Sequence, residues 1–105
     1  MLDVRTRDDG AVVITPSGVV GADEDVELRR VLVHTVRRVR PFRLIVDLAQ
    51  VRELDPLNVG SVAAACELGD DHHVTVEIVS ARLEVAERLA AAGVPHQRLR
   101  RLAQK

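Results

Sequence analysis

The chain opens with a short-period alternation of less polar and charged side chains. Residues 2–7 (LDVRTR) alternate with a period of two, which is typical of a half-buried strand with one wet face, at an edge of a sheet. Asp9-Gly10 gives a turn signal because glycine tolerates positive φ, and residues 11–15 resume an apolar run. This order predicts a β-hairpin, whose second strand continues through Val19-Val20 past a bulge at Ser17-Gly18.

The next segment carries its charges in the order that a helix dipole favours. Acidic residues crowd its start at 23–25, arginines crowd its end at 37–40, and Pro41 follows. We therefore expect a helix that ends before Pro41. Its apolar residues fall near helical spacing and predict a core face of Leu28, Val31, Leu32, Val36 and Val39. The opposite side is expected in solvent and contains Arg29, Arg30, Arg37 and Arg38.

Two short apolar runs alternate with two further helices. Residues 44–48 and 74–79 are nearly continuous apolar segments, which is typical of parallel strands covered on their faces. Between them, Asp55 is expected to cap a helix that has Pro56 at its first position, runs over 57–68 and stops at Gly69. A last helix is expected over 81–92, with Ser80 as its cap, a buried face of Leu83, Ala86, Leu89 and Ala90, and Gly93 and Pro95 after it.

This succession of elements predicts a single α/β domain over residues 1–105. We expect a mixed β-sheet with an N-terminal hairpin, central parallel strands and about three helices packed on it, joined by right-handed crossovers. The basic tail 97–105 could form a frayed helix or a short last strand plus an extension.

Composition and charge exclude several functions. Fifteen basic and sixteen acidic residues give a formal charge of -1, and Phe42 is the only aromatic residue, so neither a basic field nor stacking platforms for nucleic acid are present. No stretch approaches the length of a membrane span and none resembles a signal peptide. A lone cysteine excludes an internal disulfide. We expect a cytoplasmic protein with no membrane or nucleic-acid partner.

Residues capable of catalysis or metal binding are few and scattered. Asp70 to His73 (DDHH) has metal-ligand residue types, but in an extended segment neighbouring side chains would diverge, so a solvated loop and no metal are expected. His34 and His96 have no nucleophile beside them, and Cys66 is expected to pack as a small hydrophobe. Nucleotide-binding glycine loops are absent. The sequence predicts no cofactor and no enzyme.

Residues 44–55 (LIVDLAQVRELD) resemble the most recognisable stretch of the STAS domain family, the anti-sigma factor antagonists and their relatives. A buried strand ends in Asp-Leu, and an Asp follows at the start of a helix. Gly21 matches a glycine that the family has before its first helix, and 89–94 is similar to the exit of its third helix. The resemblance implies a STAS fold and a non-catalytic protein-interaction module.

One position departs from the family pattern. In phosphoregulated members a phosphoacceptor serine follows the Asp at the start of this helix, whereas here Pro56, Leu57 and Asn58 follow it. No phospho-switch is therefore expected at the usual position. Ser61 is the nearest hydroxyl, but it lies six residues past Asp55 and roughly 240° further around a helix, so a small packed helical residue is the favoured interpretation.

The resemblance implies a partner and a surface for it. The partner would be an anti-sigma factor of the serine-kinase type, bound by the residues around Asp55 and by the neighbouring loop, namely Asp55, Pro56, Leu57, Asn58, Gly21, Asp23 and Glu24. Asp55 is expected both to cap the helix and to contribute contact. The alternative is a scaffold or sensory subunit that acts by self-association or by binding a small ligand.

The C-terminal tail is basic and contains Arg98, Arg100 and Arg101. These arginines could dock an acidic partner, although such tails are usually solvated.

Overall fold

The computed structural model describes residues 2–95 and 98–100 and contains one five-stranded sheet with a separate two-stranded sheet beside it. The five-stranded sheet has the order β1-β2-β4-β6-β7, and the small sheet pairs β3 with β5. This arrangement confirms the predicted α/β domain. The strands are β1 (Leu2–Thr6), β2 (Val12–Pro16), β3 (Gly18–Val20), β4 (Arg43–Asp47), β5 (Val51–Leu54), β6 (Thr75–Val79) and β7 (Leu99–Arg100). The helices are η1 (Ala22–Glu24), α1 (Asp25–His34), η2 (Thr35–Val39), α2 (Pro56–His72) and α3 (Leu83–Ala91).

The N-terminal hairpin forms as predicted, with β1 antiparallel to β2 and Gly10 at a φ of 90° in the turn. β1 is an edge strand, but it is not half-buried, because Val4 remains 48% exposed on the side that faces the helices. The second strand does not continue through Val19-Val20. Gly18 adopts a φ of 81°, and the chain leaves the main sheet there to pair β3 parallel with β5.

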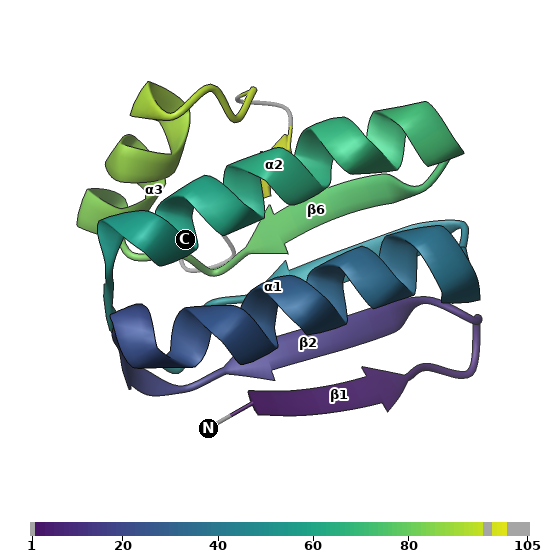
Figure 1. Ribbon diagram of the computed structural model, residues 1–105, viewed down its shortest axis with the longest axis horizontal. Helices are drawn as coiled ribbons and strands as arrows, with labels where there is room; N and C mark the ends of the chain where they lie inside the picture. The colour runs from purple at the N-terminus through teal and green to yellow at the C-terminus, as the bar shows by residue number, and fades with distance from the viewer. Residues whose placement is uncertain (1, 96–97, 101–105) are drawn as a thin grey trace.

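The two long helices cover one face of the sheet, as Figure 1 shows for α1 in front of β2 and α2 in front of β6. Alternate residues of the central strands point into this layer and are fully buried, as the periodicity of buried parallel strands predicts. These residues include Ile14, Leu44, Val46, Val76 and Ile78, all with 0% exposure.

The segment after α1 departs from a regular helix. Thr35–Val39 forms a π-helical turn, which ends at Arg40 in a left-handed conformation with a φ of 53° before Pro41. The shift in helical pitch turns Val39 outward, so its predicted place in the core face is wrong and it is 52% exposed. Thr35 is buried instead, and its hydroxyl donates to the carbonyl of Val31 at 2.8 Å.

Gly69 does not end α2, which continues through His72 to His73, a residue with a φ of 60°. A Cβ atom at Gly69 would lie 2.6 Å from the carbonyl oxygen of Val74 and 2.7 Å from Cγ2 of Val76. The glycine is therefore required by the close approach of the helix to the strand that follows it.

The third helix begins later than expected. Ser80 has a φ of 62° and lies in the loop, while Arg82 takes the N-cap position of α3. Val85, Ala86 and Leu89 form its buried face, whereas Leu83 is 56% exposed. The tail after α3 contains a short last strand, β7, which pairs parallel with β6, as one of the two expected forms of the tail requires. Residues 96–97 and 101–105 of this tail lie outside the described residues.

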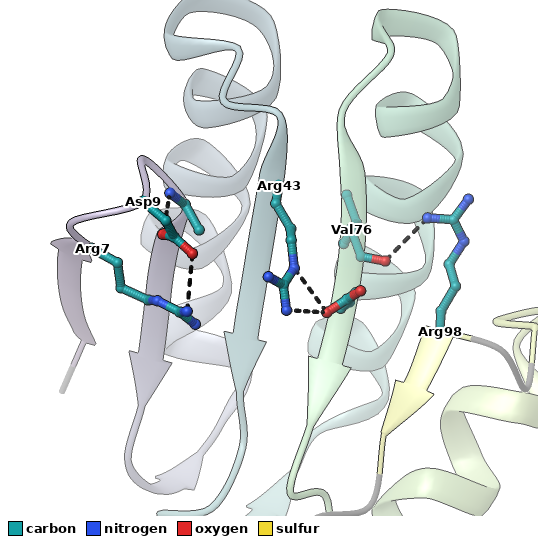
Figure 2. A network of polar contacts seen from close by, with 7 residues as sticks. Arg7, Asp9, Arg43, Val76 and Arg98 are labelled. Atoms are coloured by element: carbon teal, nitrogen blue, oxygen red, sulfur yellow. Dashed lines mark hydrogen bonds and ion pairs between the residues drawn. The ribbon is translucent and has the colours of Figure 1, made fainter.

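The face of the sheet opposite α1 and α2 carries charged side chains. Arg43 donates from Nη2 to Glu77 Oε1 at 3.0 Å across β4 and β6, and Figure 2 shows Arg43 on this face. Arg7 and Asp9 pair near the hairpin turn at 3.0 Å.

In the part of the chain that the structure describes, no helix has the length and apolar character needed to span a membrane.

Candidate functional site

The start of α2 has the geometry predicted from Asp55 and Pro56. Asp55 is extended, with φ -63° and ψ 149°, and its Oδ2 accepts the backbone N–H of Leu57 at 2.9 Å. Pro56 occupies the first turn, where a missing N–H costs nothing. Asp55 is half-buried, while Pro56 and Leu57 are exposed, Leu57 by 58%. We call Asp55, Pro56 and Leu57 the α2 tip.

Asn58 joins the α2 tip to the loop before α1. Its Nδ2 donates to the carbonyl of Val20 at 3.0 Å and to that of Gly21 at 2.8 Å. The backbone N–H of Asp55 donates to the same Val20 carbonyl at 2.9 Å. Asn58 is completely buried, so its predicted role as a contact residue is wrong. Its amide instead fixes the position of the neighbouring loop.

That loop, residues Gly21–Glu24, is closed on itself by two reciprocal bonds. The N–H of Gly21 donates to Glu24 Oε1 at 2.9 Å, and the N–H of Glu24 donates to the Gly21 carbonyl at 3.2 Å. Gly21 is extended, with φ -91° and ψ -177°, so no positive φ requires a glycine here. Asp23 and Glu24 are exposed. The structure thus brings together the two predicted surface segments.

Apolar side chains are exposed at this end of the molecule, where the N-termini of α1 and α2 lie (Figure 1). Leu57 and Val26 each stand in the first turn of one of these helices, with exposures of 58% and 64%. Val19 on β3 is 60% exposed. Isolated apolar residues on a surface are ordinary, but several around one capped helix start give a partner an apolar area to bury.

A hollow of about 510 Å³ adjoins the α2 tip and was not predicted. It lies between the small sheet and α3, and Arg52, Arg82 and Arg88 line it together with Asp55 and Pro56. Among the described residues none of these arginines forms an ion pair. Local sequence patterns carry little signal for this hollow, because it forms only where α3 lies beside β3 and β5, which are distant from it in the chain.

The hydroxyl of Ser61 faces α1 rather than the α2 tip. Its Oγ donates to Asp25 Oδ1 at 2.7 Å, and Asp25 is buried with 5% exposure. Arg29 approaches the other carboxylate oxygen of Asp25 to 4.0 Å. Leu57, Ser61 and Asp25 also line a groove of about 380 Å³ between α1 and α2. Ser61 therefore helps to hold the two helices together beside this groove.

Cys66 has the environment of a packed thiol. It is 3% exposed in the middle of α2, as expected of a small hydrophobe. Burial away from water raises the pKa of this thiol from 9.0 to about 11, opposed by the positive charge of Arg98. The thiol is therefore protonated at neutral pH and is a poor nucleophile.

Asp70, Asp71 and His72 do not form the solvated loop that we expected, because they belong to the last turn of α2. Nδ1 of His72 lies 3.0 Å from the carbonyl of Leu68, and the Asp70 carboxylate pairs with Arg98. Within residues 2–95 and 98–100, no three side chains of the metal-ligand types gather into a cation site.

Arg98 does not belong to a free basic tail. Its guanidinium donates to the carbonyl of Val76 at 3.0 Å, as Figure 2 shows, and also to Asp70. Both contacts lie within the chain, so Arg98 has a structural role and is not part of the solvated tail that we expected. Arg101 and His96 are outside the described residues.

No family model and no curated protein sequence matches this chain. Several solved structures do match it. The phosphorylated form of the Bacillus cell fate determinant SpoIIAA aligns with a TM-score of 0.80 over 94% of this chain and 88% of that chain, at 11% identity. A putative anti-sigma factor antagonist from Thermotoga maritima aligns with a TM-score of 0.77 over 95% and 84%, at 14% identity.

A STAS domain from a different kind of protein is also similar. The STAS domain of the Vibrio cholerae SulP transporter aligns with a TM-score of 0.56 over 84% of this chain and 72% of that domain, at 19% identity. The chain therefore has the STAS fold, which confirms the expectation drawn from residues 44–55.

Proposed function

We propose that this chain is a STAS-type protein-interaction module that acts as an anti-sigma factor antagonist in the cytoplasm. Its partner is an anti-sigma factor of the serine-kinase type, and binding is not gated by a phosphate at the usual position. The module performs no catalysis and needs no cofactor. Two observations support this class of function: the resemblance of residues 44–55, and the fold shared with the anti-sigma factor antagonist SpoIIAA and with the putative antagonist from Thermotoga maritima.

The observation that carries the proposal is the exposed, rigid α2 tip. Pro56 has a fixed φ, and the Asp55 carboxylate holds the first turn through the Leu57 N–H at 2.9 Å. Little conformational entropy remains to be lost when a partner buries Leu57, which stands 58% exposed. The tip thus offers an apolar anchor that is already in its bound shape.

The Gly21–Glu24 loop extends this surface with negative charge. Asn58 fixes the loop beside the α2 tip through the Gly21 carbonyl, and Asp23 and Glu24 stay exposed. A partner that covers Leu57 would therefore also meet two carboxylates, which favours a basic rim around an apolar pocket on that partner. Charge of this kind contributes mainly to specificity and to the rate of association.

The absence of a hydroxyl at positions 56 and 57 supports constitutive binding. Phosphorylation of a helix start adds about two negative charges and three acceptor oxygens, which changes the charge and shape that a partner meets there. The side chains of Pro56 and Leu57 have no hydroxyl to receive a phosphate. The nearest alternative, Ser61, already donates its hydroxyl to Asp25. The module would then respond to the amount of partner present and not to its kinase activity at the tip.

Titration calorimetry with a serine-kinase-type anti-sigma factor from the same genome tests the proposal. Leu57→Asp should weaken binding by about a hundredfold, because a buried apolar anchor is replaced by an unpaired charge. Phe42→Asp is the matched control, since Phe42 has a similar exposure of 57% and lies between η2 and β4, away from the tip. Equal binding by wild type and Leu57→Asp would contradict the assignment of this surface.

Intact-mass spectrometry tests the absence of gating. After incubation with the kinase and ATP, residues 54–61 should carry no phosphate, and affinity should be unchanged. A stoichiometric phosphate on any residue between Leu54 and Ser61 would overturn constitutive binding while leaving the interaction itself intact.

A further inference from the structure

The strand β1 leaves one of its two edges unpaired. It is the first strand of the five-stranded sheet and pairs with β2 alone among the described residues. Figure 1 shows β1 at the margin of the molecule, beside the layer of helices, with no element beyond it. Such an edge presents unsatisfied N–H and C=O groups that can template another strand.

The hydrogen bond that closes the hairpin determines which backbone groups face outward. The N–H of Arg7 donates to the Ala11 carbonyl at 2.8 Å, so the backbone groups of Arg7 point toward β2. In an antiparallel pair, this direction alternates from one residue to the next. The backbone groups of Leu2, Val4 and Thr6 therefore point away from the sheet.

The side chains of the intervening residues form a charge pattern that complements itself. Asp3 and Arg5 lie side by side on the face away from the helices, with Arg5 Nε 2.8 Å from Asp3 Oδ2. If two copies of β1 pair antiparallel around a twofold axis at Val4, Asp3 of each copy lies opposite Arg5 of the other. The same register opposes Leu2 and Thr6, so that all three outward-facing residues of each copy exchange backbone hydrogen bonds.

Other antiparallel registers are disfavoured by the same charges. A shift by two residues in one direction places Asp3 of one copy opposite Asp3 of the other. The same shift in the other direction places Arg5 of one copy opposite Arg5 of the other. Like charges directly opposite one another destabilise a strand pair. The charge pattern therefore selects a single register, the one centred on Val4.

The helix-facing side of β1 supplies apolar surface to the same contact. Val4 is 48% exposed and Val39 is 52% exposed, and together with Val31 they line a groove of about 410 Å³ between β1 and α1. Strands are about 4.8 Å apart in a sheet, so the two β2 strands of a pair would lie about 14 Å apart. That spacing leaves room for the two α1 helices to flank the paired Val4 side chains without a clash.

We propose that the chain forms a twofold dimer through antiparallel pairing of β1 with β1 of a second copy, centred on Val4. The two five-stranded sheets become one continuous sheet, and the exposed Val4 side chains meet on the side of α1. The α2 tip belongs to other elements and stays available in both copies. The dimer is thus a property beyond the proposed interaction with an anti-sigma factor.

Sedimentation velocity over a concentration series tests the dimer, and Val4→Pro tests its backbone contacts. Proline at this position removes an outward-facing N–H, so the bonds between β1 and β2 remain and the monomer should fold, as circular dichroism will show. The dissociation constant should rise about tenfold or more. A wild-type chain that stays monomeric up to about 1 mM would overturn the proposal.

A charge exchange tests the register. Arg5→Asp should raise the dissociation constant roughly tenfold, because it opposes two carboxylates at each end of the paired strands. The double variant Asp3→Arg with Arg5→Asp restores opposite charges and should return the constant to within about threefold of the wild type. Arg37→Asp, on an exposed position of η2, makes the same change of net charge and should have no effect. Failure of the double variant to restore the dimer would overturn the Val4-centred register.

Hydrogen–deuterium exchange provides a test that needs no variant. The amides of Leu2, Val4 and Thr6 should become protected as protein concentration rises, while their neighbours Asp3 and Arg5, already bonded to β2, should change little. Concentration-independent exchange at the three amides, in a sample that sediments as a dimer, would place the interface elsewhere and overturn the proposal.

Discussion

The buried amide of Asn58 lies 2.8 Å from the carbonyl oxygen of Gly21, although the two residues are 37 positions apart in the chain. This bond and its companion to Val20 connect the start of α2 with the loop before α1. A short polar side chain, hidden from any partner, therefore determines how the proposed binding surface is assembled.

Replacement of Asn58 should lower the free energy of unfolding by an amount that depends on the side chain that replaces it. Asn58→Ala removes both donated bonds and leaves a small void, so we expect a loss of about 2 kcal/mol. Asn58→Asp keeps the shape but turns a carboxylate toward two carbonyl oxygens, and it should cost about 3 kcal/mol or more at pH 7. Urea unfolding measures both values.

An exposed polar residue provides the comparison. Gln50→Ala removes a side chain in the exposed turn before β5 and should change stability by less than about 0.5 kcal/mol. Wild-type stability in Asn58→Asp would mean that the amide does not form the two bonds described above.

The contact between Ser61 and Asp25 predicts how α2 responds to added charge. Ser61→Ala removes one bond to a buried carboxylate and should cost about 1 to 2 kcal/mol. Ser61→Asp places a second carboxylate against Asp25 and should cost about 3 kcal/mol or more. Combining Ser61→Asp with Asp25→Asn removes the repulsion, so the double variant should be more stable than Ser61→Asp alone in urea unfolding. If the changes in free energy of unfolding from the two single substitutions add up to that of the double variant, the two side chains do not interact.

Several parts of this arrangement could be predicted from the sequence because their signals are local. The cap at Asp55 and the proline after it determine the start of α2 through bonds within two residues. The hairpin at Gly10 and the buried strand over 44–48 follow equally from turn chemistry and from an apolar run.

Other parts depend on contacts between distant segments and had no local signal. β5 contains the charged pair Arg52-Glu53 and exists because β3 leaves the main sheet and pairs with it. The burial of Asn58 depends on carbonyl groups at 20 and 21, which no spacing along the chain reveals. The hollow lined by Arg52, Arg82 and Arg88 requires that α3 lie beside the small sheet.

Gly69 and Gly60 should respond in opposite directions to the same substitution. Gly69→Ala places a Cβ atom 2.6 Å from the Val74 carbonyl oxygen, so it should destabilise the fold by about 1 to 3 kcal/mol despite a better helix propensity. Gly60 also lies within α2, but a Cβ atom there has open space within 4 Å. Gly60→Ala should therefore stabilise by about 0.5 to 1 kcal/mol. Thermal unfolding of both variants tests the pair, and equal shifts would contradict the close approach at Gly69.

The thiol of Cys66 predicts a loss of stability in alkaline solution. Burial raises its pKa from 9.0 to about 11 in the folded chain, so the unfolded chain releases this proton at a lower pH than the folded chain does. Stability is therefore unaffected by this group below pH 9 and falls as pH rises from about 9 to 11, by about 2 to 3 kcal/mol in total. Tyrosine is absent and Lys105 is the single lysine, so few other groups titrate in this window.

The variant Cys66→Ala separates this effect from other alkaline effects. It should be less stable than the wild type at pH 7, because a buried atom is lost, yet its stability should vary much less between pH 9 and pH 11. Urea unfolding at several pH values measures both slopes. Parallel slopes for the two proteins would show that the Cys66 thiol is not shielded from water in the folded chain, since a solvated thiol has the same pKa in both states and contributes no dependence on pH.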